Sequence, residues 1–553
     1  MAFVRSLLLV LALLSSSFTA AAARETLVIG ITQYPSTLHP GIDSMLAKSY
    51  VLGFAQRPFT VYDANWQLVC LLCTELPTLD NGGARREMTP EGGEGVALTI
   101  TIREDAFWGD GTPITSGDVE FAWRVGRNPL SGVLPTEFYK RLYRLDVVDD
   151  KTVILHFDRL THDYNAINSF YPLPAHIETE AFSEPSAYRH RTLYATDPTN
   201  PALYNGPYII DQVVTGSHIR LRRNQSWKGS PPAFETLIIR TIENTAAIEA
   251  NLLSGAIDMI AGELGLTLDQ ALAFEKRHGE QFQLIYKPGL IYEHIDLNLD
   301  NPILEDVRVR RALIHAIDRE AISSQLFGSR QPVASGPVSP LDPMFANDIP
   351  QYPFDPDQAS ELLREAGWTL DETGMLQNRA GDRLQLELMT TAGDRTRELV
   401  QQVLQSQWQQ AGIDIRIRNQ PARVFFGETV TKRQFTGLAM FAWISAPDSV
   451  PRTTLHSSEI PTAANGYVGQ NTPGFRNEEV DRLIDDMEVE MNEERRRQMW
   501  KRLQEIYAER LPAIPLYFRA NAFVLPKWLS GIEPTGHQYP TTLWVEHWRV
   551  REN

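Results

Sequence analysis

The sequence predicts an α/β protein of two or three domains. At 553 residues the chain is too long to fold around a single hydrophobic core. Residues 98–102 alternate between apolar and polar side chains, as in a half-buried strand, and a turn at 110–113 follows. Thr115 or Ser116 can then cap a helix with one apolar face. Strand, turn and helix in this order are typical of α/β domains.

The first 23 residues have the pattern of a secretory signal peptide. Arg5 precedes the apolar run 7–14, and Ala21 and Ala23 place small residues at −3 and −1 of a cleavage site. The apolar run is much shorter than the about 20 residues of a membrane-spanning helix. No cysteine follows it, which argues against lipid attachment at a bacterial lipobox. We therefore expect residues 1–23 to be a signal peptide and the mature protein to be periplasmic and not lipid-anchored.

The charge of the chain restricts its partners. The formal net charge is −17, and the basic residues form no continuous stripe. Such a field repels nucleic acid, so no nucleic-acid partner is expected.

The two cysteines, Cys70 and Cys73, are three residues apart. In an exported protein they could form a disulfide, and their spacing also fits a redox motif. Residues i and i+3 of an extended strand point to opposite faces, which argues against a bond. Their apolar neighbours fit two buried thiols equally well, so the pairing stays open.

Further elements are expected along the chain. Strands are predicted at 26–32, 145–157 (a hairpin around Asp149 and Asp150), 237–242, 413–417 and 515–518, and helices at 44–54, 246–253, 355–367, 395–410, 480–487 and 499–506. A Gly-rich polar stretch at 80–95 is predicted to be a mobile hairpin tip. The helix 395–410 followed by the strand 413–417 predicts an α/β crossover.

Several of these segments resemble one protein family. The matching positions around the first strand are Arg103, Phe107, Asp110, Gly111, Pro113, Thr115, Asp118, Val119 and Phe121. Residues 205–208, 306–313 and 355–367 match further blocks in the same order. Together they resemble the extracellular solute-binding proteins (family 5) that deliver oligopeptides and dipeptides to bacterial ABC importers.

The resemblance implies a type II periplasmic-binding-protein fold, with two lobes that enclose the ligand, an extra lobe and closure about a hinge. Lobe I is expected to comprise 24–60, 190–288 and 518–553, lobe II (the extra domain) 61–189, and lobe III 289–517. The protein is expected to be a monomer that docks on an inner-membrane ABC permease, without a cofactor, a metal or a catalytic residue.

The expected ligand site centres on residues 443–448. Trp443 matches a tryptophan of the family, followed by Ser445, but Ala446 stands where peptide-binding members usually have an aspartate that pairs with the ligand's ammonium group. An ammonium buried without such a partner costs several kcal/mol. Asp448 could reach the same place, or it could simply cap a turn after Pro447.

Three tyrosines are weaker candidates for the ligand-binding wall: Tyr34, Tyr467 and Tyr517. Aromatic walls suit a receptor that tolerates many side chains, although each ring could equally belong to the core.

The predicted function is the periplasmic substrate-binding component of an ABC transporter that imports peptides or peptide-like solutes. The alanine at 446 leaves open a non-peptide solute in the same receptor class, such as an opine, a glycan fragment or a metal chelate. A secreted hydrolase is the remote alternative, because the sequence contains no G-x-S-x-G or H-E-x-x-H motif. The protein is therefore not expected to be an enzyme.

Overall fold

The computed structural model describes residues 24–551 except 44, 134, 135, 169, 466 and 468, with residues 136, 137 and 423 described by backbone alone. The predicted signal peptide, residues 1–23, lies outside the described residues.

A ten-stranded mixed sheet organises most of the chain, in the strand order β16-β15-β17-β12-β18-β11-β1-β10-β9-β8. The strands are β1 (Thr26–Ile31), β8 (Tyr208–Val214), β9 (His218–Arg223), β10 (Thr236–Thr241), β11 (Met259–Ile260), β12 (Phe282–Leu297), β15 (Gln385–Met389), β16 (Asp414–Ile417), β17 (Leu438–Ile444) and β18 (Ala513–Pro526). β15 and β16 are parallel and are joined by α14 (Arg395–Gln410), which confirms the predicted crossover.

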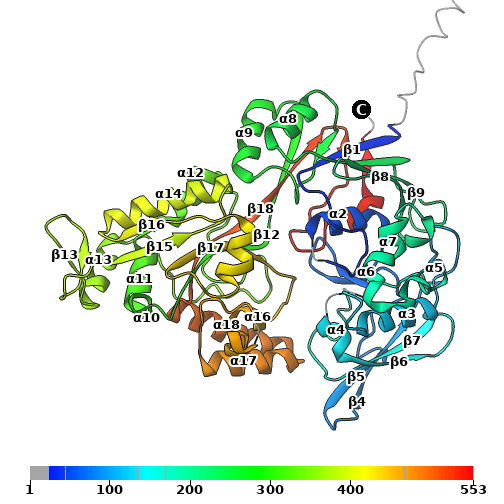
Figure 1. Cartoon of the computed structure of the whole chain (residues 1–553), viewed down its shortest axis with the longest axis horizontal. Helices are drawn as coiled ribbons and strands as arrows, with labels where there is room; N and C mark the ends of the chain where they lie inside the picture. Colours follow the sequence, from blue (N-terminus) through cyan, green and yellow to red (C-terminus); the bar gives the residue numbers. More distant parts are fainter. Residues whose placement is uncertain are drawn as a thin grey trace, which may run out of the picture.

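Two long antiparallel strands connect the two ends of this sheet. β12 and β18 pair along most of their length and run between the yellow and orange half of the molecule and the blue to cyan half (Figure 1). The pairing register of β12 with β18 changes between Pro288 and Tyr292. The ladder is therefore irregular where the two strands pass from one half of the molecule to the other.

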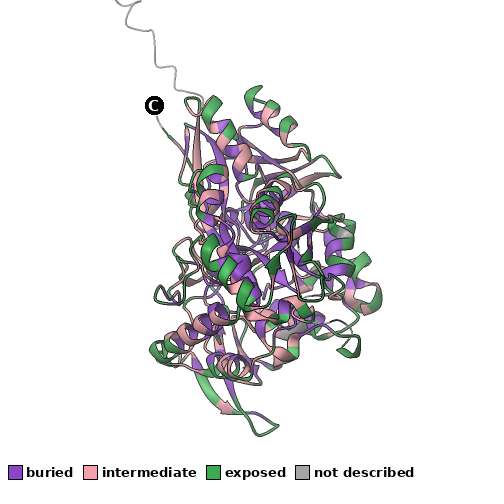
Figure 2. Ribbon diagram, turned by 90° about the vertical axis from the view of Figure 1, so that its left-hand side faces the viewer, coloured by how far each residue is buried: buried purple, intermediate pink, exposed green. Residues whose placement is uncertain are grey.

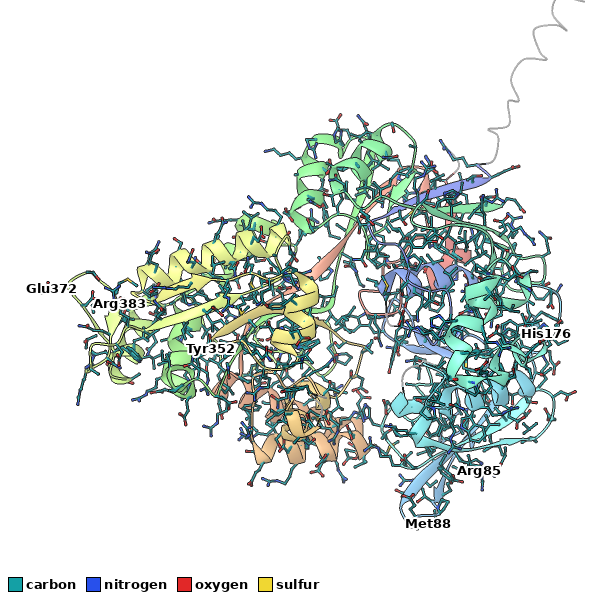
Figure 3. All side chains as sticks on the ribbon, viewed as in Figure 1. Arg85, Met88, His176, Tyr352, Glu372 and Arg383 are labelled. Carbon is teal, nitrogen blue, oxygen red and sulfur yellow. A yellow bond between two sulfur atoms is a disulfide. The ribbon has the colours of Figure 1, made fainter. Side chains whose placement is uncertain are left out.

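A separate four-stranded antiparallel sheet has the order β4-β5-β7-β6. Its strands are β4 (Ala84–Met88), β5 (Glu94–Thr101), β6 (Leu142–Val147) and β7 (Thr152–Phe157). The predicted hairpin around Asp149 is confirmed as β6 and β7. The β4–β5 hairpin projects from the edge of the molecule, with Arg85 and Met88 at its outer part (Figure 3).

Shorter paired strands are β2 (Thr60–Tyr62) with β3 (Leu68–Cys70), β13 (Thr369–Leu370) with β14 (Leu376–Gln377), and β19 (Leu529–Ser530) with β20 (Arg549–Val550). The longer helices are α2 (Leu46–Ala55), α3 (Ser116–Arg127), α8 (Thr245–Leu253), α9 (Leu268–His278), α11 (Val307–His315), α12 (Arg319–Phe327), α13 (Pro356–Glu365), α14, α17 (Glu478–Val489) and α18 (Glu493–Arg510). Short helices are α4 (Thr136–Arg141), α5 (Ala175–Glu178), α6 (Tyr188–Arg191), α7 (Leu193–Thr196), α10 (Pro302–Glu305), α15 (Ala422–Val424) and α16 (Arg452–Leu455).

The α3 helix begins where the sequence predicts. Thr115 and Asp118 form a reciprocal capping box, in which the Thr115 N–H donates to Asp118 Oδ2 at 2.9 Å. The buried Asp118 also accepts from Trp108 Nε1 at 3.2 Å and from the Ala175 N–H at 2.9 Å. One carboxylate therefore fixes the helix start, the preceding turn and a distant loop.

The core is divided among several clusters rather than being continuous. The largest cluster includes β1 and the β4–β7 sheet, and the second includes β15, β16, α11 and α14. Buried residues follow the central strands, and the outer faces of the helices are exposed (Figure 2). This distribution agrees with the expectation of more than one domain.

Cys70 and Cys73 form a disulfide, with their Cα atoms 5.3 Å apart. The argument against this bond assumed a continuous strand, but β3 ends at Cys70. The chain then turns, and Cys73 forms a bridge with Ile102 instead. The turn brings the two side chains to the same side.

In the part of the chain that the structure describes, no helix combines the length and the apolar character needed to cross a bilayer.

Candidate functional site

The candidate site lies where β17 leaves the large sheet. Trp443 pairs with Tyr292 of the neighbouring β12, and its ring packs edge-on against Phe441 with centroids 5.1 Å apart. The strand ends at Ile444, and the chain then bends away from the sheet. The predicted residues at 445 and 446 therefore lie in a loop at the edge of a rigid strand pair.

A cavity of about 250 Å³ lies against this loop. Its walls include Trp443, Ser445 and Ala446, so three of the predicted site residues lie together. β12, the loop 449–455 and α18 supply most of the remaining wall, and Gln538 reaches it from the C-terminal segment. The cavity is thus built from segments that are far apart in the sequence.

Alternate residues of β12 form one wall of the cavity: Tyr292, His294 and Asp296. Their exposed fractions are only 5%, 2% and 3%. The rings of Tyr292 and His294 are stacked, with centroids 4.8 Å apart. His294 Nε2 lies 3.1 Å from Asp296 Oδ1, and the Thr472 hydroxyl donates to the other carboxylate oxygen. A buried carboxylate is therefore held in a fixed orientation at the cavity.

The opposite wall is formed by α18. The hydroxyls of Tyr507 and Tyr292 lie 3.1 Å apart, and burial raises the pKa of both phenols, so both remain protonated. Trp500 is 4% exposed, and among the described residues its indole Nε1 has no hydrogen-bond partner. Buried donors are normally paired.

The cavity has an unusual balance of charge. Among its described lining residues, Asp296 is the one carboxylate, and neither lysine nor arginine is present. Of the same described residues, His294 is the one histidine. The cavity therefore disfavours an anionic group.

Asp448 does not line this cavity, although it is only two residues beyond Ala446. It lies in the turn after Pro447 and has a left-handed φ of 54°. Arg496 Nη2 donates to its Oδ2 at 3.2 Å. Burial raises the pKa of Asp448, although the charges of His162 and Arg496 oppose this shift.

Residues 93–461 match the profile described as bacterial extracellular solute-binding proteins, family 5 Middle. The chain belongs to this family. The oligopeptide-binding protein AppA of Bacillus subtilis (strain 168) is 25% identical over 453 residues, which cover 79% of this chain and 78% of that protein.

Solved structures of similar proteins cover nearly the whole chain. An oligopeptide-binding protein from Thermus thermophilus, complexed with a pentapeptide, is 31% identical, covers 95% of this chain and 96% of its own, and has a TM-score of 0.76. NikZ from Campylobacter jejuni, in complex with Ni(L-His), is 22% identical, covers 95% and 99%, and has a TM-score of 0.75. This solute-binding protein therefore has the predicted type II periplasmic-binding fold.

Two of the candidate tyrosines lie away from the cavity of this solute-binding protein. Tyr34 packs at the edge of the largest core cluster, and its hydroxyl is hydrogen-bonded to Thr215. Tyr467 has a left-handed φ of 60°, and its ring lies 5.9 Å from Lys432 Nζ. Neither residue is among those described as lining the cavity, and their role in binding stays a prediction.

Tyr517 lines a different cavity, of about 290 Å³, together with Glu263, Asp394 and Arg519. Its hydroxyl is buried and has no partner among the described residues. This second cavity lies between the loop after β11 and the part of β18 near its register shift. The structure therefore separates Tyr517 from Trp443.

Several lining residues were missed by the sequence reasoning. Tyr292, His294 and Asp296 alternate in the stretch 290–297, so their common face was readable from the period-two pattern. Their position opposite Trp443 depends on long-range strand pairing and was not readable. Trp500 and Tyr507 looked like members of an ordinary amphipathic helix.

Within residues 24–551, apart from the undescribed positions, no three His, Cys, Asp or Glu side chains are arranged to hold a metal ion.

Proposed function

We propose that this chain is the solute-binding component of an ABC importer and that it binds peptides or peptide-like solutes. The family membership supports a receptor role. The similarity to the Thermus protein, which was solved with a pentapeptide, supports a peptide-like ligand.

One observation carries the proposal: the predicted segment 443–446 lines a partly open cavity, to which Gln538 from the C-terminal segment also contributes. A volume of about 250 Å³ is below the range of about 300–1,000 Å³ that is typical of sites for drug-sized ligands. The cavity therefore suits one end of an extended ligand, and the rest of the ligand would lie between the lobes.

The lobe boundaries form part of the proposal. The four-stranded sheet falls inside the proposed lobe II, residues 61–189, and β15 to β17 fall inside lobe III, residues 289–517. β1 and β8 to β11 fall in the segments 24–60 and 190–288 of lobe I, which is completed by 518–553. β12 and β18 cross between lobes I and III, so we place the hinge there.

The remaining elements of the proposal concern the cellular setting. Residues 1–23 would direct export, and the mature chain would act as a monomer in the periplasm, without a lipid anchor, and dock on an inner-membrane permease. It would release its ligand unchanged, because the cavity residues are arranged for hydrogen bonding around a buried carboxylate rather than around an activated nucleophile.

A second candidate, a non-peptide solute in the same receptor class, is favoured by Ala446. This alanine lines the cavity and supplies no charge to it. A ligand without a free amine, such as an opine, a glycan fragment or a metal chelate, would not need a carboxylate at that position.

Native mass spectrometry of the mature protein, purified without refolding, tests the proposal. We expect a copurifying peptide or peptide-like mass, together with a rise in Tm on adding a peptide pool, because a ligand that binds only the folded state stabilises it. Chemical turnover of the bound molecule would overturn the proposal. A copurifying mass without amide bonds, combined with no response to peptides, would favour the second candidate.

A further inference from the structure

The carboxylate of Asp296 is the charge that this cavity presents to its contents. Its residue is 3% exposed, and its side chain lines the cavity. Among the described residues no arginine or lysine forms an ion pair with it, and His294 is its only titratable partner. A carboxylate buried without a cation is costly, because burial disfavours its charged form.

His294 is a conditional partner for this carboxylate. Its Nδ1 lies 3.2 Å from the Tyr292 carbonyl oxygen and its Nε2 lies 3.1 Å from Asp296 Oδ1. Both of these oxygens are acceptors when Asp296 is ionised, so the ring donates to both only when it is protonated. When His294 is neutral, the cavity carries a net negative charge.

Asp448 offers the contrasting case. It is already neutralised by Arg496, whose side chain is 9% exposed, and it lies outside the cavity wall. Of Asp296 and Asp448, Asp296 is therefore the one that lines the cavity and lacks a permanent cation.

We propose that Asp296 binds the ammonium group of the ligand, so that this receptor selects solutes whose enclosed end is cationic. This inference rests on the proposed function and specifies the ligand chemistry at the same site. The ammonium would donate to the Asp296 carboxylate and supply the missing positive charge.

An ammonium and the His294 ring compete for the same carboxylate, because His294 Nε2 lies 3.1 Å from Asp296 Oδ1. The other titratable groups around the ring are Tyr292, stacked on it, Tyr507 on α18, and Glu293 on the far face of β12, which is paired with Arg397 and Arg519. Both phenols stay protonated. Glu293 keeps its charge. Burial raises its pKa, but Arg397 and Arg519 lower it more, and the resulting pKa is about 2.

The experiment compares two pools of random pentapeptides that differ only at the amino end, one free and one N-acetylated. Binding to the full mature protein is measured by calorimetry and by thermal shift. The variants are Asp296→Asn, which keeps the side-chain shape, and Asp448→Asn as the matched control. We expect Asp296→Asn to lose at least about tenfold in affinity for the free-amine pool and to bind the acetylated pool as the wild type does. Asp448→Asn should not alter the preference between the two pools.

The unmodified protein provides a second test that does not depend on the folding of a variant. At about pH 6, where peptide α-ammonium groups stay charged, the wild type should bind the free-amine pool more tightly than the acetylated pool. Calorimetry measures both affinities.

Equal binding of the two pools by the wild type, or an unchanged preference in Asp296→Asn, would overturn this inference and leave the proposed function intact. A loss of the preference in Asp448→Asn instead would assign the charge to Asp448 and would also overturn it. If the wild type binds neither pool and copurifies with no peptide, the proposed function fails and the inference fails with it.

Discussion

Asp448 and Arg496, both in the proposed lobe III, form an ion pair, with Oδ2 and Nη2 3.2 Å apart. His162, from the segment after β7, approaches the same carboxylate oxygen at 3.6 Å and also donates its backbone N–H to the Glu488 carbonyl oxygen at 2.8 Å. His162 therefore links this ion pair in the proposed lobe III to the proposed lobe II. Its geometry indicates a structural role for Asp448, in keeping with the turn-capping alternative.

Replacing Asp448 with asparagine is expected to destabilise the ligand-free protein. The change leaves the buried Arg496 without its counter-charge. We expect the free energy of unfolding to fall by about 1–2 kcal/mol, which is less than for a fully buried ion pair because the Asp448 side chain is 30% exposed. Thermal unfolding measures the loss, with Glu478→Gln as the control because that side chain is 95% exposed. An unchanged Tm would show that the ion pair does not stabilise the folded protein.

Replacing Trp443 with alanine is expected to remove most of the ligand-induced rise in Tm. Trp443 lines the cavity and packs on Phe441. Truncation of an aromatic residue in a desolvated site typically costs about 2 kcal/mol or more of binding free energy, which corresponds to about a 30-fold loss of affinity. The measurement is the difference in Tm with and without ligand, which cancels the effect of the variant on the free protein. Trp227, whose ring lies 5.4 Å from Arg57 outside the cavity, provides the control Trp227→Ala. Full affinity in Trp443→Ala would remove Trp443 from the site.

Glu293 is expected to contribute a large part of the stability that the folded protein loses in acid. Although burial raises its pKa, Arg397 and Arg519 lower it from 4.5 to about 2. The folded state therefore binds this proton less readily than the unfolded state does. The stabilisation, on the order of 3 kcal/mol, is present above pH 4.5 and is lost as the pH falls towards 2.

Denaturant unfolding of the wild type and Glu293→Gln between about pH 2 and pH 7 checks this expectation. The wild type should lose stability relative to the variant as the pH falls below about 4.5. If the free energies of unfolding of the two proteins changed in parallel with pH across this range, the assignment to Glu293 would be contradicted.

Asp342 is expected to destabilise the protein at neutral pH. Burial and the nearby charge of Asp448 together raise its pKa to about 6, although hydrogen bonds from the backbone N–H groups of Met344 and Asp448 oppose the shift. The folded state holds an extra proton between about pH 3.8 and 6, so the contribution of Asp342 to stability falls as the pH rises through that window.

Asp342→Asn keeps an acceptor for the Met344 N–H and removes the charge. We expect it to raise the free energy of unfolding by about 1–3 kcal/mol at about pH 8 and to leave it nearly unchanged at about pH 4. A gain of equal size at both pH values would point to a cause other than ionisation.

The local elements were predictable because their signals lie within a few residues. The capping box of Thr115 and Asp118, the helix 395–410 and the strand after it all appear where the pattern placed them. The pairing of Cys70 with Cys73 was left open because strand periodicity gives no information on where a strand ends.

The candidate site was only partly predictable because it depends on contacts between distant segments. Trp443 could be singled out from the local motif, but Asp296 reaches the same cavity through the pairing of β12 with β17, and Trp500 reaches it from α18. Asp448 has the nearer position in sequence, and its left-handed turn directs it to Arg496 instead. Proximity along the chain was therefore a poor guide to which carboxylate faces the ligand.

The most direct measurement is a crystal structure of the mature protein purified with its natural solute. We expect electron density for one end of that solute between Trp443 and the β12 wall, with a nitrogen atom within hydrogen-bonding distance of the Asp296 carboxylate and the remainder of the solute between lobes I and III. Density for the solute elsewhere on the protein, with the 250 Å³ cavity occupied by water alone, would contradict the assignment of the site.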